Sequence, residues 1–105
     1  MAHCPPELLD DLGDVLAEVR RWAGVKEENP GVFYVRREPF LHFHLLKGGR
    51  RRGDIKGTRG WVSLDLPRPI SATRRLALRR ALHTHYREKW RDACRSRSAR
   101  PPGPR

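Results

Sequence analysis

The sequence of 105 residues has no apolar run of 18 or more residues and no charged-then-apolar segment at its start. A transmembrane helix needs about 20 apolar residues, so we expect neither a membrane span nor a secretory signal. Only two cysteines occur, Cys4 and Cys94, and neither belongs to a CxxC or CxxH motif. Isolated cysteines are typical of reduced thiols, so we expect a cytoplasmic protein, with a disulfide between the two as the less favoured alternative.

Sequence signatures of several enzyme classes are also missing. The glycine-rich stretch KGGRRRGDIKGTRG lacks the Gly-Lys-Ser/Thr ending of a nucleotide-binding P-loop. We expect a mobile loop there, with at most one short strand at residues 52–56. Ser63 could meet a histidine and Asp65 on one sheet face, but no nucleophile elbow surrounds it. We therefore favour a non-catalytic protein that has no catalytic residue and no cofactor.

Acidic residues are scarce toward the C-terminus. Residues 1–31 carry three Lys/Arg and seven Asp/Glu, a net of −4, whereas residues 68–105 carry twelve against two, a net of +10. Such asymmetry favours a nucleic acid or another polyanion as the partner. Nineteen of the 23 basic residues are arginine, and a GC-rich genome alone would produce the same bias. Both explanations of the charge stay open.

Two helices are predicted near the ends of the chain. In residues 6–23 apolar side chains recur every three or four positions, which makes one apolar stripe. Ser71 is a suitable N-cap for a second helix that runs to about Cys94. Its inner arc consists of Leu78, Ala81, Leu82, His85, Tyr86 and Ala93. Residues 95–105 have no large apolar side chain to bury, so we expect one domain over residues 1–94 and a disordered basic tail after it.

Between the helices, the segments VFYVRR, FLHFHLL and WVSLDL alternate in the manner of strands with one buried face. If Phe33 and Val35 share that face with Leu41 and Phe43, opposed residues of the two strands must have numbers with an even sum. This parity requires an odd-length connection, such as three residues around 37–39. The order helix, three to four strands, helix predicts an α+β fold, an antiparallel sheet with both helices packed on one face.

The other face of this sheet would stay uncovered by helices. Strand parity places His42 and His44 on that face, away from Leu41 and Phe43. Their neighbours there are Tyr34, Arg36, Phe40, Trp61, Ser63 and Asp65. This face is richer in aromatic and ionisable side chains than a solvated face needs, and we predict that it binds a ligand. Its predicted ligand-binding residues are Tyr34, Arg36, His42, His44, Trp61 and Asp65.

The two histidines leave several roles open. Histidines two positions apart on a strand can chelate zinc or iron, but such a site needs a third ligand and usually a fourth. Asp65 is the obvious candidate on the same face, and Asp54 would have to reach from the loop. Because this ligand set is incomplete, we expect no metal ligands here and no tight zinc binding. The alternatives are a small-ligand or metal site, a solvated face, and a protein-interaction face that pairs with a second subunit.

A second predicted site lies on the last helix. Arg80, Arg87 and Arg91 recur at intervals of seven and four and therefore line one outer stripe. Guanidinium groups can hold phosphates through paired hydrogen bonds, so we predict polyanion binding there. Glu88 and Asp92 lie beside the stripe and reduce its charge. A charged outer face is also what an ordinary surface helix shows.

The arrangement of these motifs resembles that of small bacterial α+β domains. An opening helix that ends in EVRRWAGV precedes a hairpin with the pattern F-x-V…F-x-H-x-H, a strand of the type GWVSL and a helix that ends near HYRE. These segments, within residues 8–90, are similar to the luciferase-like family, and the layout is more loosely similar to MmcQ/YjbR-like proteins. The first resemblance implies an α+β fold of uncharacterised function, and the second implies a DNA-binding-like fold. Neither supplies a catalytic residue.

Overall fold

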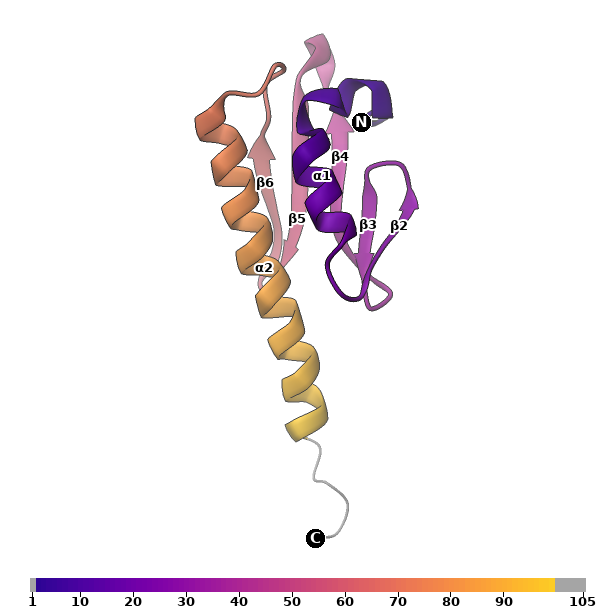
Figure 1. The fold of residues 1–105 in the computed structure, drawn as a ribbon, viewed down its shortest axis with the longest axis vertical. Helices are drawn as coiled ribbons and strands as arrows, with labels where there is room; N and C mark the ends of the chain where they lie inside the picture. Colours follow the sequence, from indigo (N-terminus) through magenta and orange to yellow (C-terminus); the bar gives the residue numbers. More distant parts are fainter. Residues whose placement is uncertain (1, 100–105) are drawn as a thin grey trace, which may run out of the picture.

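The computed structural model describes the backbone of residues 2–99 and the side chains of residues 3–90. Its elements, in chain order, are β1 (Ala2–His3), the 3-10 helix η1 (Pro6–Leu12), α1 (Gly13–Arg20), β2 (Val25–Asn29), β3 (Val32–Val35), β4 (Glu38–Leu45), the 3-10 turn η2 (Lys47–Gly49), β5 (Arg51–Gly57), β6 (Gly60–Asp65) and α2 (Ala72–Ala99). Figure 1 shows the two helices lying against an antiparallel sheet, which confirms the predicted α+β fold.

The main path of the sheet has five strands, in the order in which they follow one another along the chain, β2-β3-β4-β5-β6. The short β1 pairs with β4 as well, beyond the end of β3. The sheet therefore has more strands than the three to four predicted. Strand β2 escaped prediction because its sequence, VKEEN, lies at the sheet edge and has one apolar residue. The turn that returns it to β3 contains Gly31 at a φ of 78°, a conformation that favours glycine.

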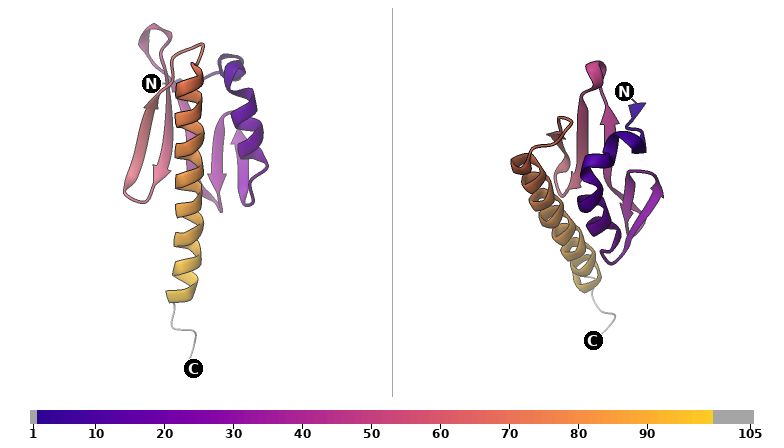
Figure 2. Two further views of the ribbon diagram at one scale, coloured as in Figure 1. Left: turned by 60° about the vertical axis from the view of Figure 1, so that its left-hand side comes forward. Right: turned by 45° about the horizontal axis from the view of Figure 1, so that its top comes forward.

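Both helices cover the same face of the sheet, as predicted (Figure 2). The side chains buried between helices and sheet are Cys4, Leu9, Leu12, Val15, Leu16, Val19, Phe33, Val35, Phe40, Leu41, Phe43, Ile55, Leu66, Ile70, Leu78 and Leu82. Cys4 is a free thiol in this core, and burial raises its pKa. The side chain of Cys94 lies outside the described range.

The first helix differs in detail from the single helix predicted over residues 6–23. Its first seven residues form the 3-10 helix η1, and α1 then ends at Arg20. A 3-10 helix has three residues per turn, so Leu9 and Leu12 lie above one another, and both are buried. The predicted apolar stripe thus reaches the core through two helical geometries rather than one.

A two-residue turn, Arg36 and Arg37, connects β3 to β4, with Val35 opposite Glu38. Both arginines have positive φ angles, 52° and 72°. This is the conformation of a type I′ hairpin turn, whose twist matches that of the adjoining strands. The predicted odd-length connection is therefore wrong.

A bulge in β4 shifts the register by one residue, so that Phe33 and Leu41 share the buried face as predicted. The register changes from Tyr34 opposite Pro39 to Phe33 opposite Leu41, which leaves Phe40 as an extra residue. Beyond the bulge Phe33 pairs with Leu41, and their residue numbers have the predicted even sum. Phe40 itself is fully buried, so its predicted place on the open face is wrong.

The last helix begins as predicted, since the Ser71 hydroxyl accepts a hydrogen bond from the Arg74 amide at 3.2 Å. Helix α2 continues to Ala99, five residues beyond the expected end, and residues 100–105 of the predicted tail lie outside the described residues. Within the part of the chain that the structure describes, no helix is both long and apolar enough to cross a membrane.

Candidate metal centre

Three adjacent strands bring polar side chains together on the face without helices. His42 lies opposite Asp54 in the β4–β5 pair, and Asp54 lies opposite Ser63 in the β5–β6 pair. Opposed residues share a face, and the alternate residues Leu41 and Phe43 are buried under the helices. The predicted placement of His42 and His44 away from the core therefore agrees with the structure.

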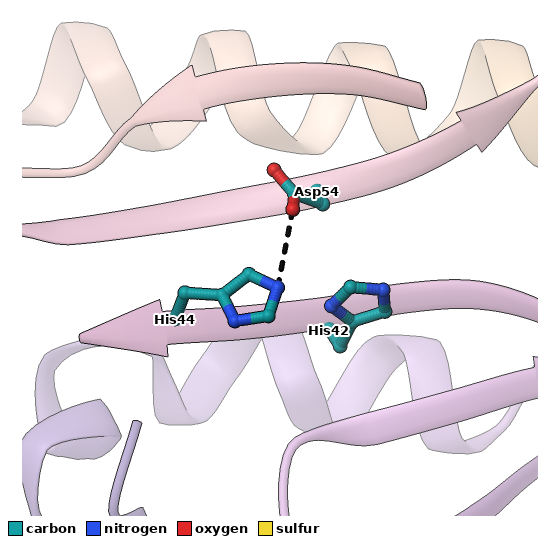
Figure 3. A group of neighbouring side chains, drawn as sticks. All are labelled: His42, His44 and Asp54. Carbon is teal, nitrogen blue, oxygen red and sulfur yellow. Dashed lines mark ion pairs between the residues drawn. The ribbon is translucent and has the colours of Figure 1, made fainter. Parts of the chain in front are cut away.

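His42, His44 and Asp54 form one compact group, drawn in Figure 3. The His44 Nε2 atom lies 3.2 Å from Asp54 Oδ2, and the His42 ring meets the His44 ring edge-on, with 4.7 Å between centroids. One ligand atom from each residue can be chosen so that all three atoms lie within 4.8 Å of one another. The sequence expectation depended on a missing third ligand, and Asp54 lies in the position that such a ligand would occupy.

These distances are close to those of a zinc site. Zinc bonds of about 2.0–2.2 Å in a tetrahedron place the ligand atoms about 3.3 Å apart. The contact between His44 and Asp54 already has this length. The ligand atom on His42 lies within 4.8 Å of the other two, and it would have to move closer to complete a tetrahedral site. The Nδ1 atoms of His42 and His44 are buried without a hydrogen-bond partner among the described residues, so donors at this site are still unused.

The Asp54 carboxylate is fixed by neighbours on its own strand and on β6. The Ser63 hydroxyl donates a hydrogen bond to Oδ1 at 2.8 Å. Arg52 has Nε 3.0 Å from Oδ1 and donates from Nη2 to Oδ2 at 3.2 Å. Only 6% of Asp54 is exposed, and these contacts hold the buried carboxylate in one orientation. A cation bound to Oδ2 would replace the contacts that this oxygen makes with Arg52 Nη2 and with His44 Nε2.

Burial influences the charge state of His42. It lowers the pKa of His42, and the neighbouring His44 ring lowers this pKa further, while the Asp54 carboxylate acts in the opposite direction. His42 is therefore neutral at pH 7, and neutral imidazole is the form that ligates metals.

Trp61 and Asp65, two further predicted ligand-binding residues, lie on β6 at the edge of this group. The Trp61 ring meets the His42 ring edge-on at 4.6 Å and is 43% exposed. Asp65 is opposite Arg52, and its carboxylate is 4.0 Å from Arg74. Trp61 therefore forms one wall of the group, while Asp65 is not part of it.

The remaining two predicted residues lie apart from the group. Tyr34 is half-buried on β3, where it pairs with Lys26 and Pro39. Arg36 does not lie on the open face, so that prediction is wrong. As a turn residue, Arg36 places its guanidinium 3.8 Å from the centre of the Trp90 ring on α2.

Arg80 and Arg87, from the predicted polyanion stripe, are exposed on α2, and no acidic partner is found for either among the described residues. The Arg91 side chain lies outside the described range. Other arginines of α2 are paired with carboxylates on α1; Arg79, for example, lies 3.0 Å from Glu18. Part of the basic charge of this helix therefore stabilises the fold.

The sequence analysis gave Asp54 little weight because it expected a mobile loop there, with at most one short strand at residues 52–56, whereas β5 is a full strand in the sheet. The alternation that places Asp54 between buried Gly53 and Ile55 is visible only once this strand is known. Comparison with known proteins adds nothing at this point: no protein-family model, no curated protein and no solved structure matches this chain. The resemblance to the luciferase-like family stays a prediction.

Proposed function

We propose that this protein binds a transition-metal ion of the zinc class through His42, His44 and Asp54. The observation that carries the proposal is the approach of three donor atoms to within 4.8 Å on one sheet face. Two imidazoles and one carboxylate are a donor set typical of zinc and iron(II) sites. Three protein ligands leave a coordination position for water or an exchangeable ligand.

The residues around the group support this function. Metal-binding carboxylates are usually held by further hydrogen bonds, and Ser63 and Arg52 hold Asp54 in this way. The sheet backbone forms the floor of the site, and Leu41 and Phe43 are buried on its other side. A buried floor limits the access of water to the ligand atoms on that side.

A zinc titration of untagged protein tests the proposal. We expect one Zn²⁺ per chain by mass spectrometry of metals, and binding should be lost in His44→Ala and in Asp54→Asn. Two matched controls should bind like the parent protein. His83→Gln removes a histidine on α2, and Asp65→Asn removes a carboxylate from the same face but outside the group. Equal binding by Asp54→Asn and the parent, or no binding by the parent, would contradict the proposal.

A second candidate function is weak electrostatic binding of nucleic acid. It is favoured by the exposed Arg80 and Arg87, which have no acidic partner among the described residues, and by the net charge of +11. Such binding would depend on phosphate contacts and would show little base specificity.

A further inference from the structure

Strand β1 brings a third histidine to the metal group. His3 lies opposite His44 in the β1–β4 pair, on the side of β4 away from Asp54. The centroid of the His3 ring lies 5.9 Å from that of the His44 ring and 6.5 Å from that of the His42 ring. The next residue, Cys4, fixes this segment in place, because its amide donates a hydrogen bond to the Phe43 carbonyl at 3.1 Å and its side chain is buried.

We propose that His3 is the fourth protein ligand of the metal ion, and that metal binding fastens β1 to β4. This inference rests on the proposed function and adds a ligand and a structural consequence to it. The ligands then come from three neighbouring strands, with His3 and Asp54 on either side of the β4 histidines. Four protein ligands close the coordination sphere, as in a structural zinc site.

The pairing of β1 with β4 favours this ligation, although the His3 ring lies outside the compact group and must turn toward the ion. Opposed residues of antiparallel strands have Cβ atoms about 4.5–5.5 Å apart, so two imidazoles in such a pair can share one ion. The His3 side chain is exposed and can turn toward the ion without displacing core residues. With a divalent ion bound, three neutral imidazoles and one carboxylate would give the site a net charge of +1. The guanidinium of Arg52 lies beside it.

The consequence for β1 follows from its length. The strand has two residues, and so short a pairing adds little stability by itself. A bond from His3 to an ion held by β4 and β5 would tie this segment directly to the centre of the sheet. The metal would then strengthen the attachment of β1 to the sheet, in addition to the hydrogen bond of the Cys4 amide.

Cobalt(II) reports on its ligands, because the positions and intensities of its visible bands change when a water molecule replaces a protein ligand. We expect a strong visible band in the parent protein and in the control His83→Gln. In His3→Ala the band should weaken, and affinity for Co²⁺ should fall by about 10- to 100-fold or more, because even second-shell partners have effects of that size. The metal-free His3→Ala protein should unfold at the same temperature as the parent.

Hydrogen exchange supplies a readout that is independent of the spectrum. Addition of Zn²⁺ should slow exchange of the Cys4 amide in the parent and leave it unchanged in His3→Ala. If the parent binds metal and His3→Ala binds with the same affinity and the same spectrum, His3 is not a ligand and the three-residue site stands. If the parent binds no metal, both the inference and the proposed function fail.

Discussion

The guanidinium of Arg51 donates hydrogen bonds from Nη1 and Nη2 to the two carboxylate oxygens of Asp11, at 2.6 and 2.9 Å. It also donates to the carbonyls of Leu66, Leu8 and Pro67, at 2.9, 2.6 and 3.1 Å. Arg51 is 1% exposed, although it is the first residue of β5. A single buried side chain thus ties η1 to the sheet and to the connection between β6 and α2.

Replacing Arg51 by Met should destabilise the protein by about 3–5 kcal/mol, because it leaves the Asp11 carboxylate and three carbonyls without their donor. Urea denaturation measures this loss, and Arg51→Lys, which keeps the charge, offers a milder variant if Arg51→Met does not fold. Arg68→Met is the control: its ion pair with Asp10 is exposed and should contribute no more than about 1 kcal/mol. Similar losses in Arg51→Met and Arg68→Met would contradict the importance of the buried pair.

The same pair predicts a specific response to acid. Its hydrogen bond from Arg51 lowers the pKa of Asp11 below the ordinary value of 3.8. The resulting stabilisation is present above pH 3.8 and is lost as the pH falls through the lowered pKa. Asp11→Asn lacks this contribution. The difference in free energy of unfolding between parent and variant should therefore be smaller in the acid range than at pH 7. Urea titrations at a series of pH values check it, and a constant difference would refute it.

The burial of Arg51 could not be predicted from the sequence, whereas much of the fold could. Periodicity predicted both helices, β4, β6 and the face that carries His42 and His44, because apolar alternation reports directly which side chains are buried. It could not predict that an arginine in a glycine-rich stretch would be a core residue, since its burial depends on Asp11, 40 positions away. The candidate site was predicted in part for the same reason: Asp54 was expected to reach it from a loop, and its place on β5 beside the histidines was not predicted.

The β3–β4 turn can be stabilised by one substitution. Arg37 has a φ of 72°, which costs an L-residue about 1–2 kcal/mol and costs glycine little. Arg37→Gly should therefore stabilise the protein by up to about 1 kcal/mol. Arg36→Gly should not, because it removes the stacking of Arg36 on Trp90. Thermal unfolding of the two variants compares them directly, and equal effects would argue against the stacking contribution.

Nucleic-acid binding, if it occurs, should be largely electrostatic. The logarithm of the binding constant for fluorescent duplex DNA should fall linearly with the logarithm of salt, by about 0.9 for each phosphate contact. Truncation after Cys94 should reduce the slope, and reversal of the arginine stripe to Glu should reduce it further. The stripe variant changes Arg80, Arg87 and Arg91. A control of equal charge changes Arg37, Lys47 and Arg50.

The control reverses exposed residues in turns outside α2. If both triple variants weaken binding equally, the affinity reflects net charge rather than a site on the helix. If the full chain fails to bind at low salt, the nucleic-acid function is excluded.

The sequential strand order has a consequence for folding during synthesis. Each strand of the main path pairs with the one made just before it, so the sheet can form as successive hairpins while the chain emerges. Its apolar face stays half covered until Leu78 and Leu82 follow, since both belong to the last helix. A nascent chain stalled before that helix would expose Ile55 and Leu66, surface that chaperones bind. The apolar face of the sheet is therefore fully covered only once α2 has been synthesised.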